Sequence, residues 1–105
     1  MATVTSGYAH QERIAQGVAN ATTALAADVA RIRYELGEDW SGGGAVFFRV
    51  LLKDSASKRS HLREVARRVV SKISSEVQPG ELGLQAYFNF RSESEQARLN
   101  EEAWT

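Results

Sequence analysis

Residues 45–53 read AVFFRVLLK. One face of an extended chain here carries four apolar side chains, Val46, Phe48, Val50 and Leu52. The other face alternates apolar and basic side chains, Phe47, Arg49, Leu51 and Lys53. Because apolar groups on both faces are typical of a strand inside a sheet, this segment is predicted to be a central strand.

A second strand is predicted just before it, from Ala30 to Gly37. Three apolar residues alternate there with three charged ones: Ile32, Tyr34 and Leu36 with Arg31, Arg33 and Glu35. This period of two predicts a half-buried strand. Residues 37–44 contain the run Gly42-Gly43-Gly44 and are expected to form a flexible connection, so that the two strands pair antiparallel.

Two long helices are predicted around these strands. The first runs from Tyr8 to about Asp28, with Ser6 as its N-cap and an apolar face of Ile14, Val18, Ala21 and Leu25. The second covers residues 56–77 and ends at Pro79 and Gly80. Its N-cap candidates are Asp54, Ser55 and Ser57, and its expected buried face is Leu62, Val65, Ala66, Val69, Ile73 and Val77.

A third strand and a short helix complete the chain. Leu84, Ala86, Phe88 and Phe90 recur with a period of two. Ser92 and Glu95 have capping-box spacing, which predicts a helix over about 93–101. Residues 92–105 are thus expected to be a helical tail. Residues 1–7 are expected to be flexible, although residues 2–5 could form a short strand.

The order α-β-β-α-β predicts one domain over residues 1–105, an α+β two-layer sandwich. Its three-stranded sheet has two helices on one face, and a short C-terminal helix follows. The arrangement is similar to a ferredoxin-like fold without its first strand, which residues 2–5 could supply, and to the type II KH fold. KH domains clamp nucleic acid with a GxxG loop, and none occurs between Ser55 and Gly80.

The composition excludes several classes of protein. The 105 residues include 13 basic and 13 acidic side chains, so the formal net charge is zero and long-range attraction to nucleic acid or membrane is absent. The absence of cysteine excludes disulfides and thiolate metal sites. With no membrane-length apolar run and no secretory leader pattern, we expect a cytoplasmic protein.

Side chains suited to catalysis are sparse. His10 and His61 stand far apart, and no metal-binding, nucleophile-elbow or phosphate-loop motif is present. Glu38 and Asp39 could bind a cation, but Asp is also favoured in turns. We therefore expect no enzyme, no metal site and no cofactor.

The sheet face opposite the helices mixes aromatic, aliphatic and basic side chains: Arg31, Arg33, Phe47, Arg49, Leu51, Lys53, Gln85, Tyr87 and Asn89. The sequence leaves three ways in which this face could be covered. The C-terminal segment could fold back, with Leu99 and Trp104 on the patch. Another protein chain, either a second copy or a different partner, could bind there. Alternatively, RNA bases could stack on Phe47 and Tyr87. Trp40 could fold onto the sheet edge or belong to an interaction loop.

Charge is uneven along the chain. Residues 56–80 hold six basic and two acidic side chains, a net charge of +4, whereas residues 81–105 hold two basic and five acidic ones, a net charge of −3. Four basic residues border the buried face of the second helix: Arg63, Arg67, Arg68 and Lys72. They are either a solvated border or a docking surface for nucleic acid or an acidic partner.

Two segments carry a further pattern. Residues 33–42 read RYELGEDWSG and are followed by FFRVLL at 47–52, while YFNFRS at 87–92 leads into SEQA at 94–97 and AW at 103–104. Together they resemble a family of small uncharacterised bacterial proteins with HEPN-type gene neighbours. HEPN proteins are helical and often act as RNases in toxin–antitoxin pairs. Since the chain lacks their RxxxxH pattern, the resemblance implies a companion or antitoxin-like partner.

These observations predict a non-enzymatic protein-interaction module that binds another chain, as a homodimer or with a HEPN-type partner. The expected partner-binding residues are Arg31, Arg33, Trp40, Phe47, Arg49, Leu51, Tyr87 and Trp104. RNA binding is the alternative, with Arg63, Arg67, Arg68 and Lys72 as possible nucleic-acid contacts.

Overall fold

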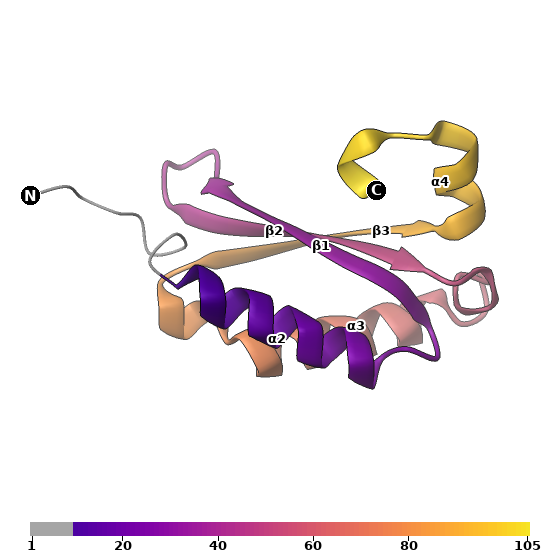
Figure 1. The fold of residues 1–105 in the computed structure, drawn as a ribbon, viewed down its shortest axis with the longest axis horizontal. Coiled ribbons are helices and arrows are strands. Elements are labelled where there is room, and N and C mark those ends of the chain that lie inside the picture. The colour runs from indigo at the N-terminus through magenta and orange to yellow at the C-terminus, as the bar shows by residue number, and fades with distance from the viewer. Residues whose placement is uncertain (1–9) are drawn as a thin grey trace, which may run out of the picture.

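The structure, a computed structural model, describes residues 10–105. The expectations for the N-terminal segment lie outside these residues: the flexible residues 1–7, the possible strand at 2–5 and the N-cap Ser6. The described chain is an α+β fold, as predicted (Figure 1). Its helices are α2 (Gln11–Ala24), α3 (Leu62–Val77) and α4 (Glu93–Leu99), and its strands are β1 (Val29–Glu38), β2 (Gly44–Leu52) and β3 (Gln85–Ser92). Three short 3-10 turns are η1 (Asp54–Ala56), η2 (Pro79–Leu82) and η3 (Glu102–Trp104).

The sheet has the order β1-β2-β3, so the predicted central strand β2 is confirmed. β1 pairs with it antiparallel and β3 parallel; Phe48 stands opposite Tyr34 on one side and Phe88 on the other. α3 provides the crossover that a parallel pair needs. This pairing differs from that of a complete ferredoxin-like fold. That fold is a split βαβ arrangement, with a further strand between the parallel pair, whereas β2 and β3 here bond directly.

The two long helices cover one face of the sheet, as predicted (Figure 1). α4 and η3 lie on the opposite face, over one end of it. Between the sheet and the long helices lies a single apolar core, in which Phe48 is fully buried and stacks on Phe88 with 5.1 Å between ring centroids. The other large, fully buried side chains are Ile14, Val46, Val50, Leu52, Val69, Ile73 and Val77.

α2 and α3 approach most closely at Gly17. A Cβ on this glycine would lie 2.7 Å from the main-chain oxygen of Glu76 and 2.8 Å from Cγ2 of Val77. These distances are shorter than carbon atoms tolerate, so the absence of a side chain sets the spacing of the two helices. The glycine costs helix propensity but permits the packing.

The start of α3 differs from the capping expectation, whereas α4 begins at its predicted N-cap residue. α3 begins at Leu62 rather than near residue 56, with His61 as N-cap residue and no side-chain cap. Leu62, expected in the core, is 40% exposed. Asp54 instead accepts hydrogen bonds from the main-chain N–H and the hydroxyl of Ser94, which ties η1 to the first turn of α4. The Ser92 side of the predicted capping box is confirmed: Ser92 Oγ accepts from the Glu95 N–H at 3.0 Å.

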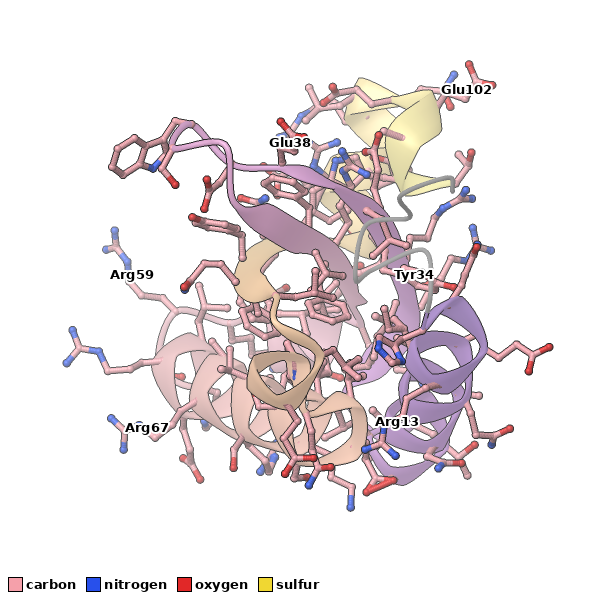
Figure 2. The ribbon with its side chains drawn as sticks, turned by 90° about the vertical axis from the view of Figure 1, so that its left-hand side faces the viewer. Arg13, Tyr34, Glu38, Arg59, Arg67 and Glu102 are labelled. Atoms are coloured by element: carbon pink, nitrogen blue, oxygen red, sulfur yellow. The ribbon has the colours of Figure 1, made fainter. Side chains whose placement is uncertain are left out.

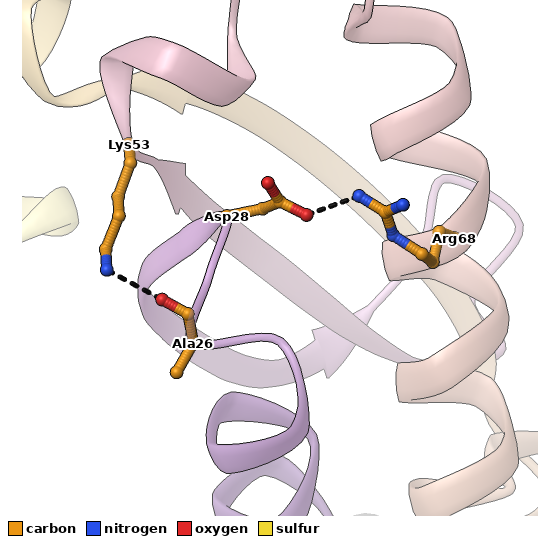
Figure 3. Close-up of polar contacts among 4 residues, drawn as sticks. All are labelled: Ala26, Asp28, Lys53 and Arg68. Atoms are coloured by element: carbon orange, nitrogen blue, oxygen red, sulfur yellow. Dashed lines mark hydrogen bonds and ion pairs between the residues drawn. The ribbon is translucent and has the colours of Figure 1, made fainter.

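A polar cluster ties the turn between α2 and β1 to two other elements (Figure 3). Arg68 of α3 forms an ion pair with Asp28, and Lys53 donates from Nζ to the Ala26 carbonyl at 2.7 Å. The Lys53 N–H also donates to the Asp28 carbonyl at 2.8 Å. These contacts explain why the first helix ends at Ala24 rather than near Asp28: residues 25–28 form a turn that is clamped from both sides.

Substituting Gly17→Ala is expected to destabilise the protein by about 1–3 kcal/mol, because the added methyl group overpacks a contact with main-chain atoms. Chemical denaturation measures the change. Gly80→Ala is the matched control, because a Cβ there meets nothing within 4 Å, and it should leave stability nearly unchanged. A Gly17→Ala protein as stable as the parent would contradict the assigned packing.

Candidate functional site

Three neighbouring cross-strand rows carry the larger side chains of the outer face of the sheet, and a row of Gly37, Ala45 and Gln85 separates them from the β1–β2 loop. The first of the three, next to that row, contains Glu35, Phe47 and Tyr87. The middle row contains Arg33, Arg49 and Asn89, and the third contains Arg31, Leu51 and Arg91. The sheet therefore brings the predicted partner-binding residues of the strands onto one surface, as the alternation required.

The C-terminal tail covers the third row. The Arg91 guanidinium lies 4.4 Å from the ring centroid of Trp104, which is 9% exposed. Arg91 also donates to Gln96 Oε1 at 2.8 Å and pairs with Glu101 at 2.7 Å. The folded-back tail is thus confirmed for Trp104, but Leu99 is 47% exposed and takes no part in the covering.

The arginines of β1 are also engaged by the tail. Arg31 and Arg33 each donate from Nη1 to the main-chain oxygen of Thr105 at 2.5 Å. In the middle row, Arg49 forms an ion pair with Glu35 at 2.9 Å. Every arginine of this face therefore has an acceptor within the chain, which reduces what the face offers to a phosphate backbone.

The first row forms an aromatic platform of Phe47 and Tyr87. Their rings stack with 5.3 Å between centroids and 16° between planes, and both residues are half-buried. On the other side of Phe47 is Gly37, where an added Cβ would lie 3.6 Å from Cε2 of the ring. Gly37 belongs to β1 and does not end the strand, because the neighbouring ring fills the space that its missing side chain leaves.

The loop at residues 39–43 is held by Asp39, so it is not the flexible connection that the glycines predict. Asp39 Oδ1 accepts from the Ser41 N–H at 2.9 Å, the Ser41 hydroxyl at 2.6 Å and the Gly43 N–H at 3.0 Å. Its other oxygen accepts from the Tyr87 hydroxyl at 3.2 Å. Gly42 has φ 85°, a conformation that suits glycine. The Asp39 carboxylate thus joins the loop to the aromatic platform.

These contacts displace two pKa values in opposite directions. The pKa of Asp39 is lowered, chiefly by the hydrogen bond from the Ser41 hydroxyl, because hydrogen bonds to a carboxylate stabilise its charged form. The pKa of Tyr87 is raised, chiefly by loss of hydration and then by its hydrogen bond to Asp39. Asp39 is therefore an anchor of the loop and not a free carboxylate available to a cation.

Trp40 is 93% exposed at the tip of this loop. It does not fold onto the sheet edge. The loop is pinned by hydrogen bonds on either side of Trp40, from Asp39 N to the Gly43 carbonyl at 2.9 Å and from Gly42 N to the Asp39 carbonyl at 3.0 Å. The fold thus presents a large aromatic side chain to solvent on an ordered loop. We define the loop-end surface as Trp40, Phe47 and Tyr87.

The basic residues of α3 separate into two groups. Arg68 pairs with Asp28, and Lys72 lies 3.8 Å from Glu76, so these two are bound within the fold. Arg63 and Arg67 are exposed and form no ion pair within residues 10–105. Arg59 and Arg67 extend into solvent on the side of α3 away from α2 (Figure 2). Of the four predicted nucleic-acid contacts, two thus have an acidic partner within the fold and two have none among the described residues.

Sequence reasoning missed the anchors of the tail and the loop. Arg91, Gln96 and Asp54 hold the tail; Gln96, 8% exposed, also donates to the Glu101 carbonyl at 2.7 Å. Only the capping box signalled that a helix begins there. Aspartate is a common turn residue, so a turn at Asp39 was expected. Its hydrogen bond with Tyr87 spans 48 positions, and no local sequence pattern indicates it.

Comparison with protein-family models, curated proteins and solved structures gave no match. In the described part of the chain, no helix combines the length and apolar character needed to cross a bilayer. Across residues 10–105, no three His, Asp or Glu side chains cluster in a way that could hold a metal ion.

Removing Arg91 is expected to release the tail. Arg91→Met keeps the apolar stem but loses the contacts to Gln96, Glu101 and the Trp104 ring, which should lower the free energy of unfolding by about 1–2 kcal/mol. The indole N–H signal of Trp104 in NMR spectra should move toward its unfolded position. Arg98→Met is the control, because exposed Arg98 has no ion pair within residues 10–105. An unchanged indole signal in Arg91→Met would refute this anchoring.

Asp39→Ala is expected to open the loop, because four hydrogen bonds to its carboxylate are lost together. Hydrogen exchange at the Ser41 and Gly43 amides should accelerate, whereas Glu38→Ala, which alters the exposed neighbouring carboxylate, should not affect it. The same loosening should occur in acid. Because the folded pKa of Asp39 is lowered, its stabilisation is present above the unfolded value of about 3.9 and is lost as the pH falls through the folded value. Exchange that is equally slow in both variants would contradict the role of Asp39.

Proposed function

We propose that the protein is a non-enzymatic interaction module that binds another protein chain through the loop-end surface. The observation that carries the proposal is the exposure of Trp40, 93%, on a loop held by the Asp39 hydrogen bonds. Burying such a side chain in a partner yields a large hydrophobic gain, and an ordered loop loses little conformational entropy on binding. Tryptophan and tyrosine are also the residues that most often dominate binding energy.

The extent of the surface follows from what the tail leaves uncovered. Arg31, Arg33 and Trp104, expected to contact a partner, are occupied with the tail. Phe47 and Tyr87 remain half-buried beside the Trp40 loop, with the Arg49–Glu35 pair next to them. An apolar centre bordered by a charged pair is the usual composition of a protein interface.

Binding is favoured over catalysis by the origin of the displaced pKa values. Within the described residues, the displaced carboxyl groups are those of Asp39 and Asp54, and both pKa values are lowered mainly by hydrogen bonds from serine hydroxyls. These bonds hold the loop and the tail. RNA binding, the alternative, is weakened because the arginines beside Phe47 and Tyr87 already have acceptors.

The identity of the partner is also part of the proposal. The motif resemblance points to a bacterial companion or antitoxin-like role beside a HEPN-type protein, and a second copy of the chain is the other candidate. Either would provide an apolar pocket for Trp40.

The test compares Trp40→Ala with Leu99→Ala, which removes an exposed apolar side chain from α4. Each purified protein is examined by light scattering and used for quantitative co-purification from the native host. We expect the parent and Leu99→Ala to associate with the same chain, and Trp40→Ala to lose most of it. A monomer that captures nothing, or equal capture by Trp40→Ala, would reject the proposal.

A further inference from the structure

A second surface lies along β3. This strand is at the edge of the sheet, so one side of its backbone has no strand beside it within residues 10–105. Its inward-facing residues Ala86, Phe88 and Phe90 are half-buried, whereas their neighbours on β2 are fully buried. The core is therefore incompletely covered along this edge.

Two hollows lie between α3 and β3. One, of about 540 Å³, includes Ser74, Pro79 and Phe88 in its wall, and the other, of about 160 Å³, includes Leu62 and Phe90. The helix contributes a stripe of residues four positions apart, none of them fully buried: Leu62, Ala66, Val70 and Ser74. We define the edge groove as this stripe together with Phe88 and Phe90.

The helical wall of the edge groove is basic. Arg63 and Arg67 follow Leu62 and Ala66 in the helix and lie on its solvent side, and Arg59 precedes them; all three are exposed. Figure 2 shows Arg59 and Arg67 extending away from the molecule on this side. Among the described residues none of the three has an ion pair. Glu95 lines the hollow beside Leu62 and Glu81 the hollow beside Ser74, while the three arginines extend from the N-terminal end of α3 toward its middle.

We propose that the β3 edge accepts an extended segment of an acidic partner protein as a fourth strand. The segment would bond to the free backbone of β3, place apolar side chains against Leu62, Phe88 and Phe90, and direct carboxylates toward Arg63 and Arg67. Strand addition of this kind obtains affinity from main-chain hydrogen bonds and specificity from alternate side chains. The site shares strand β3 with Tyr87 of the loop-end surface, but it lies toward the helices and does not involve Trp40.

The charge of the edge groove favours one of the molecules that could bind there. A second copy of the chain would bind by a two-fold axis, which sets the same patch against itself and therefore opposes a surface with three exposed arginines and two glutamates to an identical one. An acidic segment complements the arginines better than this surface does. A nucleic acid strand would meet Glu81 and Glu95 in the two hollows and would leave the unpaired backbone of β3 without a continuous partner. An acidic peptide strand satisfies both the arginines and the backbone.

The test uses a capped peptide of alternating valine and glutamate, with a valine–lysine peptide of equal length as control. Each is titrated into isotope-labelled protein and followed by NMR. We expect the glutamate peptide to shift the amide signals of β3 and the first half of α3, to slow hydrogen exchange in β3, and to bind more weakly as salt is added. Arg67→Glu should weaken binding about five- to tenfold, whereas Arg98→Glu, with the same change in net charge, should not.

Further measurements distinguish this proposal from its alternatives. Trp40→Ala should bind the glutamate peptide as the parent does, since Trp40 takes no part in the edge groove. Any of four results would overturn the proposal: equal binding of the lysine peptide, no change in β3, tighter Arg67-dependent binding of oligouridylate RNA, or sedimentation of a dimer whose contacts map to β3.

Discussion

The fold depends on the burial of β2 between two neighbouring strands and under two helices. Phe48 is fully buried, stacks on Phe88 and stands opposite Tyr34, so one side chain joins all three strands to the core. α2 and α3 can cover this strand together because Gly17 lets them approach closely. In a chain this short, a single well-packed layer supplies most of the hydrophobic stabilisation. The helices therefore occupy one face, and the other face must be stabilised by different means.

That outer face is stabilised by two clusters of polar contacts at its opposite ends. At one end, Arg91 holds Trp104 and Glu101, and Arg31 and Arg33 hold Thr105. At the other end, Asp39 joins the loop to Tyr87. In both, an ionic group accepts or donates several hydrogen bonds, which satisfies charges on a partly apolar sheet. The tail engages Arg31, Arg33 and Arg91, while the loop leaves Trp40 exposed. This difference is why the proposed binding surface lies at the loop end.

The secondary structure was largely predictable because it depends on local periodicity. The period of two along β2 and the Ser92 N-cap of α4 both act over a few residues, and both are confirmed. The boundaries were less predictable. Aspartate is a favoured N-cap residue, but Asp54 accepts hydrogen bonds from Ser94 and does not cap α3, since a long-range donor competes with the local ones. The glycines after Trp40 indicate flexibility, whereas the Asp39 carboxylate orders them.

The sequence alone determined the element order, the inward face of β2 and the mixture of aromatic and arginine side chains on its outer face, because alternation fixes which residues share a face. The tertiary structure decided three further features. It paired β3 directly with β2, it folded the tail over Arg91, and it left the β3 edge and Trp40 uncovered. These depend on contacts between residues far apart in the chain, and no local pattern encodes which distant group will reach a given side chain.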